Sequence, residues 1–234
     1  MTAIRDGALP SGEAKTRAVR AMFDTIAPRY DLVNRVMTFG LDRRWRRTAV
    51  GALGLPPGSL VVDVACGTGD LCRDLTDAGM EPIGVDLSAG MLAHARTSAP
   101  LVHTDALRLP VAGGSVDGAV SGFALRNFEA LEPVFAELVR VLRPGGRVAL
   151  LDVATPANPL LRTGHAVYFG HLVPRIGAAL SDGDAYRYLP KSVAYLPAPP
   201  ELLRILAAAG FATVERRLLS GGITQLITAT RSAM

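Results

Sequence analysis

Two glycines mark a short loop, residues 65–70, in which the backbone could approach a ligand closely. Gly67 and Gly69 follow an almost wholly apolar run, and the helix expected directly after the loop would offer its N-terminus to the ligand. The dinucleotide-binding fingerprint requires a third glycine three positions after Gly69, where this chain has Cys72. Because that third glycine serves close packing beside a pyrophosphate, its absence argues against a dinucleotide.

Carboxylates at both ends of the loop indicate the charge of the ligand. Asp63 lies within the preceding strand, and Asp70 directly follows Gly69. They would repel a pyrophosphate, but they suit the cationic sulfonium and amino groups of S-adenosylmethionine. The alternative is a structural turn in which Asp70 caps the following helix.

Further polar positions lie at the ends of the next two expected strands. Asp86, followed by Leu87, ends the second strand, where a carboxylate can accept hydrogen bonds from both hydroxyls of a ribose. The alternative is a charge at the start of the next helix, beside Ser88. Asp105 and Ala106 end the third strand, where class I methyltransferases hold the adenine amino group, although an ordinary turn would also account for them.

The elements that position these residues alternate between strands and helices, which is typical of a parallel α/β sheet. The strand before the loop is apolar almost throughout, as expected of a strand that is buried on both faces. The expected strands are Leu60–Ala65, Pro82–Leu87, Leu101–Thr104, Gly118–Phe123 and Val148–Val153, and the expected helices between them are Asp70–Ala78, Ser88–Arg96 and Glu129–Leu142.

The end of the chain departs from this alternation. A helix at Glu201–Ala209 precedes two strands, Thr213–Leu218 and Ile223–Thr230, with a turn at Ser220–Gly222 between them. A closing hairpin is unusual for a dinucleotide dehydrogenase but is expected of class I S-adenosylmethionine methyltransferases, whose seventh strand inserts antiparallel. We therefore predict their Rossmann-like α/β fold, a seven-stranded and mostly parallel sheet with an antiparallel terminal strand and a helical cover.

The length of 234 residues and the apolar share of 49% suit a single domain with a large core. We expect a flexible N-terminus over 1–15 and one methyltransferase domain over 16–234. Within that domain, N-terminal helices are expected in 16–55. A mostly helical cover is expected at 157–200, where prolines and aromatic residues interrupt the alternation.

Composition excludes several classes of protein. A net charge of +4 is too weak to argue for a nucleic-acid partner. Cys66 and Cys72 have no histidine nearby, and the four histidines are scattered, so we expect neither a disulfide framework nor a metal site. The first residues lack the apolar core of a signal peptide, and charged residues or prolines interrupt every apolar run. These features predict a soluble, cytoplasmic protein.

Stretches outside the loop resemble one specific family, the quinone-ring C-methyltransferases of menaquinone and ubiquinone synthesis. Because these stretches lie outside the cofactor loop, descent from methyltransferases in general does not explain them. The resemblance covers nearly the whole chain. The stretches are Met22–Asp24, Ala27–Asp31 with Asn34, Phe39–Trp45, Phe123–Asn127, Leu172–Gly177, and Tyr186–Leu189 with Ser192.

The resemblance implies roles for particular residues. Tyr30 and Tyr186 would accept a proton or form walls against the acceptor, with core packing as the alternative for either. The family's serine lies one position later than Ser121 does here, which is a departure at an expected cofactor contact. The cofactor contacts so implied are Thr68, Asp86, Asp105, Ala106 and Ser121, and the residues placed around the acceptor are Arg126, Asn127, Tyr186 and Tyr188.

Arg126 has the most direct chemical role in this comparison. Methylation of a ring carbon requires the hydroquinone, whose phenol must lose its proton before the ring becomes a carbon nucleophile. A guanidinium beside the oxygen would stabilise that phenolate, directly or through water. The alternative is a salt bridge to Glu129 or a solvated loop arginine.

The resemblance implies methylation of a ring carbon in a demethylated menaquinol. Departures from the family pattern leave open a tailoring methyltransferase that acts on another small molecule, a secondary-metabolite ring or a prenyl diphosphate. Quinone substrates carry long tails that dissolve in the membrane, so a peripheral membrane contact is also expected to be possible. A homodimer is left open as well. Arginines that could contact anionic lipid, or form a solvated helix face, surround Trp45 at Arg43, Arg44, Arg46 and Arg47.

Overall fold

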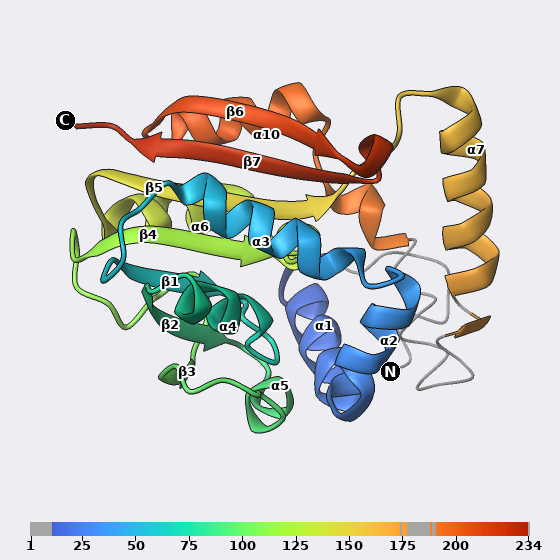
Figure 1. Ribbon diagram of the computed structural model, residues 1–234, viewed down its shortest axis with the longest axis horizontal. Helices are drawn as coiled ribbons and strands as arrows, with labels where there is room; N and C mark the ends of the chain where they lie inside the picture. Colours follow the sequence, from blue (N-terminus) through green and yellow to red (C-terminus); the bar gives the residue numbers. More distant parts are fainter. Residues whose placement is uncertain (1–10, 174, 177–187, 189–190, 234) are drawn as a thin grey trace.

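One seven-stranded sheet organises the computed structural model, which describes residues 11–173, 175–176, 188 and 191–233 (Figure 1). The strand order is β3-β2-β1-β4-β5-β7-β6. The first five strands are parallel, and β7 lies antiparallel between β5 and β6. The predicted fold is confirmed. The strands are β1 (Leu60–Val64), β2 (Glu81–Asp86), β3 (Leu101–His103), β4 (Val116–Gly122), β5 (Leu142–Val153), β6 (Phe211–Leu219) and β7 (Thr224–Arg231).

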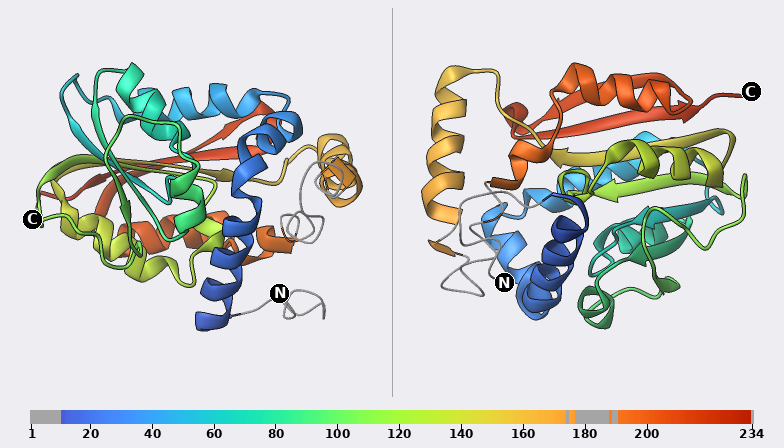
Figure 2. Two further views of the ribbon diagram at one scale, coloured as in Figure 1. Left: turned by 90° about the horizontal axis from the view of Figure 1, so that it is seen from below. Right: turned by 180° about the vertical axis from the view of Figure 1, so that it is seen from behind.

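Helices cover both faces of the sheet, which explains why its central strands are apolar throughout (Figure 2). Successive residues of a strand point to opposite faces. Val61 accordingly belongs to the same buried cluster as Trp45, whereas Val62 belongs to the cluster around Phe135. The covering helices are α3 (Leu41–Leu53) and α4 (Asp70–Asp77) on one face, and α6 (Leu131–Val141) and α10 (Pro199–Ala208) on the other.

Strand β5 begins earlier than the sequence predicted. It pairs with β4 already at Leu142, and the pairing resumes at Arg147 after a register shift. Residues 143–146, which lie between the predicted helix and the predicted strand, are therefore an irregularity inside β5. Ladder hydrogen bonds on both sides of this bulge keep the strand continuous.

The remaining helices lie beyond the carboxyl ends of the parallel strands (Figures 1 and 2). The first helix starts at Gly12 rather than at Thr16. The described part of the predicted cover is mostly helical. The described helices beyond these strand ends are α1 (Gly12–Ile26), η2 (Ala27–Arg29), α2 (Tyr30–Met37) and α5 (Ala89–Ala93), followed by η3 (Leu125–Asn127), α7 (Pro159–Val167), η4 (Tyr168–Leu172) and η5 (Val193–Tyr195).

Candidate active site

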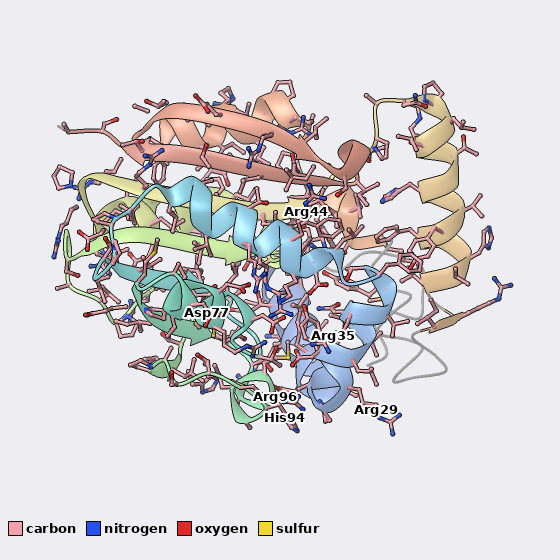
Figure 3. The ribbon with its side chains drawn as sticks, in the orientation of Figure 1. Arg29, Arg35, Arg44, Asp77, His94 and Arg96 are labelled. Atoms are coloured by element: carbon pink, nitrogen blue, oxygen red, sulfur yellow. The ribbon has the colours of Figure 1, made fainter. Side chains whose placement is uncertain are left out.

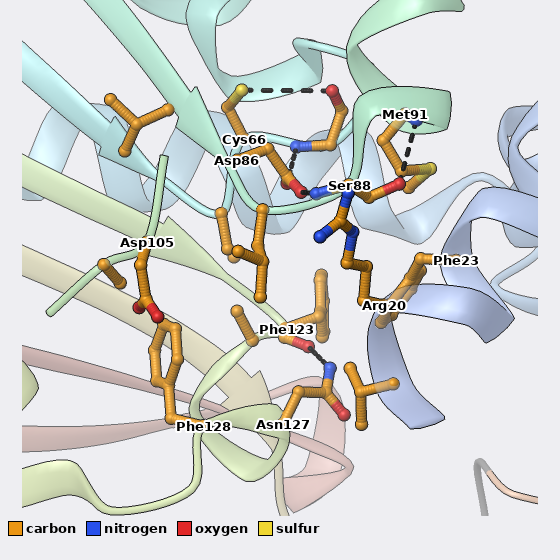
Figure 4. Close-up of a pocket in the computed structure, with 18 of the residues that line it drawn as sticks. Arg20, Phe23, Cys66, Asp86, Ser88, Met91, Asp105, Phe123, Asn127 and Phe128 are labelled. Carbon is orange, nitrogen blue, oxygen red and sulfur yellow. Dashed lines mark hydrogen bonds between the residues drawn. The ribbon is translucent and has the colours of Figure 1, made fainter. Parts of the chain in front are cut away.

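A cavity of about 490 Å³ lies between the carboxyl ends of the central strands and the N-terminal helix α1 (Figure 4). Ligands of open α/β sheets bind at this edge. Most of the residues that the sequence placed at the ligand line this cavity. They are Tyr30, Asp63, Gly67, Thr68, Asp86, Leu87, Asp105, Ala106 and Asn127.

The loop after β1 owes its shape to two glycines and one carboxylate. Gly67 and Gly69 have φ angles of 56° and 80°, in the region that favours glycine. The Asp86 carboxylate accepts a 2.8 Å bond from the Gly67 amide and another 2.8 Å bond from the Ser88 amide. Asp86 thus joins the ends of β1 and β2. Burial raises the pKa of this carboxyl.

Asp63 is a buried carboxylate, and only one of its two oxygens accepts a hydrogen bond from the part of the chain that the structure describes. Its side chain is 0% exposed, and Oδ2 accepts a 3.3 Å bond from the Cys72 thiol. Oδ1 has no hydrogen-bond partner among the described residues, although Asp63 lines the cavity. Burial raises the pKa of this carboxyl to about 7. A buried, unsatisfied carboxylate oxygen is costly, so the site suits a cationic ligand group that would pair with it.

Helix α1 forms the wall opposite the strands, which the sequence did not predict. Arg17, Arg20 and Phe23 line the cavity from this helix, and Figure 4 shows Arg20 extending towards Ser88 and Asp86. The guanidinium groups of Arg17 and Arg20 therefore face the cavity from α1, where the Glu13 carboxylate also lines it. The helical spacing of these positions was visible in the sequence, but nothing local indicated what the helix would face.

Hydrogen bonds fasten the N-terminal helices to the strand side of the cavity. Asp24 accepts bonds from the Ser88 hydroxyl at 2.6 Å and from the Gly90 amide at 2.9 Å. Asp31 accepts a bond from the Thr68 hydroxyl at 2.5 Å. Asp24 and Asp31 belong to the family-like stretches, and that pattern was the only sequence signal for them.

Lys15 fastens α1 to the other side of the site. Its ammonium donates a 2.5 Å bond to the Phe128 carbonyl and lies 3.8 Å from the ring centroid of Tyr195. Burial lowers the pKa of Lys15 to about 8, although the nearby Glu129 carboxylate opposes the shift.

Arg126 was expected either beside the acceptor or, as the alternative, in a salt bridge to Glu129 or in solvent, and its contacts differ from these expectations. Its guanidinium pairs with Asp152, not with Glu129, and its Nε donates a 3.1 Å bond to the Ser192 hydroxyl. Both charged side chains are buried, and Arg126 is not among the described residues that line the cavity. The geometry therefore makes Arg126 part of a neutralised pair behind the cavity wall.

Three other predicted residues also lie behind the wall. Ser121 is buried and donates a 2.8 Å bond to the Val64 carbonyl, which joins β4 to β1. Tyr188 is buried and donates a 3.3 Å bond to the Asn127 side chain. Gly69 supplies the turn rather than a wall of the cavity. Tyr186 lies outside the described residues.

Among the tyrosines that the structure describes, Tyr30 lines the cavity. Burial raises the pKa of its phenol, whereas a hydrogen bond with Asn34 and the positive charge of Arg126 lower it to a lesser extent. The phenol therefore stays protonated at neutral pH. It is better suited to donate a hydrogen bond to a ligand than to accept a proton from one.

The arginines around Trp45 do not form one solvated face. Arg46 is mostly buried and pairs with three carboxylates, those of Asp42, Asp70 and Asp74. The Trp45 side chain is buried and donates a 2.7 Å bond to the Ser220 hydroxyl. Only the other three arginines of this group are exposed, namely Arg43, Arg44 and Arg47.

Comparisons with known proteins extend over nearly the whole chain. Residues 11–231 match the model of the ubiE/COQ5 methyltransferase family. The chain is 42% identical to the ubiquinone/menaquinone biosynthesis C-methyltransferase UbiE of Syntrophotalea carbinolica, over 91% of this chain and 94% of that protein. It is also 42% identical to the demethylmenaquinone methyltransferase of Roseiflexus sp. (strain RS-1), over 94% of this chain and 96% of that protein.

Solved structures share the fold at low sequence identity. A SAM-dependent methyltransferase from Aquifex aeolicus has a TM-score of 0.58 and 15% identity, covering 79% of this chain and 88% of that one. Phosphoethanolamine N-methyltransferase 2 of Haemonchus contortus, solved with S-adenosyl-L-methionine, has a TM-score of 0.60 and 15% identity. The match covers 80% of this chain and 52% of that one.

Removal of one partner of the buried Arg126–Asp152 pair should destabilise the protein strongly. Asp152→Ala leaves a buried guanidinium uncompensated, and we expect a loss of about 3–5 kcal/mol in the free energy of unfolding, measured with urea. The double variant Arg126→Met/Asp152→Leu is the control, because it removes both charges and should regain much of that loss. Equal losses in the two variants would show that the pairing of charges is not what matters there.

Proposed function

The chain belongs to the ubiE/COQ5 methyltransferase family, and we propose that it transfers a methyl group from S-adenosylmethionine to a ring carbon of a demethylated menaquinol. The observation that carries the proposal is 42% identity, over more than nine-tenths of each chain, to relatives named for this step in quinone synthesis. A tailoring reaction on another small molecule is not favoured, because these relatives are named for quinone synthesis.

The cavity suits the charge and shape of S-adenosylmethionine. Asp86 would accept hydrogen bonds from the ribose hydroxyls, since a carboxylate keeps lone pairs free after the two amide bonds that it already receives. The adenine would lie against Leu87, Asp105 and Ala106, at the ends of the next strands. Asp63 would pair with the amino group of the methionine part, which satisfies its unpartnered oxygen. When bound, this cofactor supplies an electrophilic methyl group.

The acceptor ring would lie on the side of the cavity formed by α2 and the segment after β4. Tyr30 and Asn127 line that side, and Phe123 supplies an apolar surface beside them. The Tyr30 phenol, which remains protonated, would donate a hydrogen bond to a ring oxygen and so favour charge on that oxygen. The ring carbon would form the new bond to the methyl group as the bond from that methyl group to sulfur breaks, which would leave S-adenosylhomocysteine. The ring carbon would then lose its own proton to a base or to water.

Arg126 acts in this proposal as a positioning residue. Its pair with Asp152 holds η3, and η3 presents Asn127 to the cavity while Tyr188 fixes the Asn127 side chain from behind. Asp152 largely offsets the guanidinium charge, so any direct stabilisation of the acceptor's phenolate would be weak. Tyr186 stays a candidate for the proton acceptor.

The acceptor also suggests where the protein works. Quinols of this class carry long apolar tails, so we propose a peripheral contact with a membrane. No helix in the described part of the chain is long and apolar enough to cross one. A homodimer is a separate proposal, which the mass of the protein in solution would test.

The oxidation state of the acceptor tests the proposed reaction. Labelled S-adenosylmethionine should methylate a short-tailed demethylmenaquinol but not the corresponding quinone, because only the reduced ring can become a carbon nucleophile. A catechol and a prenyl diphosphate serve as alternative acceptors in the same assay. Equal turnover with and without reductant, or a clear preference for an alternative acceptor, would refute the proposal.

Asp86→Ala should weaken cofactor binding. The ribose loses a charged acceptor and the loop after β1 loses its anchor, so calorimetry should show a loss on the order of 2–3 kcal/mol. Asp77→Ala is the matched control, because Asp77 is an exposed carboxylate at the end of α4. An unchanged dissociation constant for Asp86→Ala would remove Asp86 from the site.

Cofactor binding should release a proton below neutral pH. Burial raises the pKa of Asp63 to about 7 from its unfolded value near 3.9, so the cofactor-free protein loses stability as the pH rises from about 4 to about 7. A cationic amino group favours the carboxylate, so binding of S-adenosylhomocysteine at pH 6 should release about one proton and tighten as the pH rises towards 7.

Calorimetry in two buffers with different ionisation enthalpies measures that proton release. Asp63→Asn is the control, because it cannot ionise and should bind with the same heat in both buffers. If the parent protein also gave equal heats, Asp63 would not be the partner of the amino group.

A further inference from the structure

Exposed large apolar side chains are concentrated at one end of the molecule. Of the nine found among the described residues, seven lie on α2 and its following turn or on α7 and η4. We call these seven the apolar face. They are Leu32, Val36, Phe39, Leu160, Leu161, Val167 and Leu172.

The two parts of the apolar face are joined. The Tyr168 hydroxyl donates a 2.7 Å bond to the Met37 carbonyl, and the rings of Tyr168 and Phe39 lie 5.7 Å apart. Both parts lie beyond the carboxyl ends of the parallel strands in each view (Figures 1 and 2). Neither α7 nor η4 buries a residue, and Leu160 and Phe39 are 81% and 77% exposed. Packing within the described chain therefore does not explain these side chains.

Arginines outnumber acidic residues in the two segments that carry the apolar face. Residues 159–176 contain no acidic residue. Residues 29–47 contain two, Asp31 and Asp42, which are engaged by Thr68 and Arg46. Figure 3 shows Arg29 and Arg35 beside the N-terminal helices. The arginines of these two segments, apart from the buried Arg46, are Arg29, Arg35, Arg43, Arg44, Arg47, Arg162 and Arg175.

Helix α2 connects this surface to the active site. Tyr30 and Asn34 line the cavity from one side of the helix, whereas Leu32 and Val36 are exposed on another. The same helix therefore carries a residue of the cavity, Tyr30, and a residue of the apolar face, Leu32, two positions apart. A helix that is apolar towards the outside and flanked by arginines is typical of segments that lie in a membrane interface.

We propose that the apolar face docks on an anionic lipid bilayer, with its leucine, valine and phenylalanine side chains among the upper acyl chains and its arginines beside lipid phosphates. The position of the docking surface follows from the exposed residues and their charge. Its use in delivering an acceptor with an apolar tail rests on the proposed function. The docked orientation would bring the cavity next to the hydrocarbon in which such an acceptor is dissolved.

Cosedimentation with vesicles tests the docking. The full chain should bind vesicles of phosphatidylcholine with phosphatidylglycerol, should bind pure phosphatidylcholine much less, and should be released as salt is raised. Leu160→Ser/Val167→Ser removes apolar anchors from α7 and should lower the partition coefficient by roughly tenfold. Arg35→Glu/Arg162→Glu reverses two charges and should lower it at least as much.

Two controls separate docking from folding and from catalysis. Leu218→Ser and Arg204→Glu change exposed side chains on β6 and α10, outside the apolar face, and should bind vesicles like the parent protein. The Leu160→Ser/Val167→Ser variant should methylate a short-tailed soluble quinol normally, which distinguishes loss of docking from failure of the proposed function.

Unchanged vesicle binding by both face variants would overturn the proposal, and so would equal binding to anionic and neutral vesicles. A stable dimer in analytical ultracentrifugation that the face variants dissociate would assign the surface to a second copy of the chain instead.

Discussion

The junction that Asp86 makes between two strand ends is the contact on which the candidate site depends. Its carboxylate receives the Gly67 amide from the loop after β1 and the Ser88 amide from the start of α5. Ser88 in turn donates to Asp24 of α1. A chain of hydrogen bonds therefore runs from the sheet through one carboxylate to the helix that closes the cavity.

Burial of two carboxylates at the cavity costs electrostatic free energy. Asp63 and Asp86 are held in surroundings that disfavour their charged forms, and among the described residues neither has an ion-pair partner. The buried guanidinium of Arg126, by contrast, is paired with Asp152. Both uncompensated carboxylates line the cavity, where a cationic ligand would supply the missing charge.

The proposed acceptor side offers uncharged hydrogen-bonding groups to the ring. Tyr30 and Asn127 line it, and the Arg126 charge behind them is paired with Asp152. Leu32 and Val36 extend apolar character from this side of the cavity to the outer surface. A substrate with a polar ring and an apolar tail would meet matching surroundings along its whole length.

Local patterns in the sequence were sufficient for the alternation of strands and helices, the loop at Gly67 and Gly69, and the carboxylate at the end of β2. Each of these depends on residues close together in the chain, whose periodicity and spacing reflect the geometry of strands, turns and parallel sheets. The sequence suggested Glu129 only as an alternative partner for Arg126, because Glu129 is near in sequence, whereas the observed partner Asp152 is near only in the folded sheet. The wall formed by α1 and the apolar face likewise arise from contacts between distant segments. Only the tertiary structure decided them, since a helical pattern shows which residues share a face but not what that face meets.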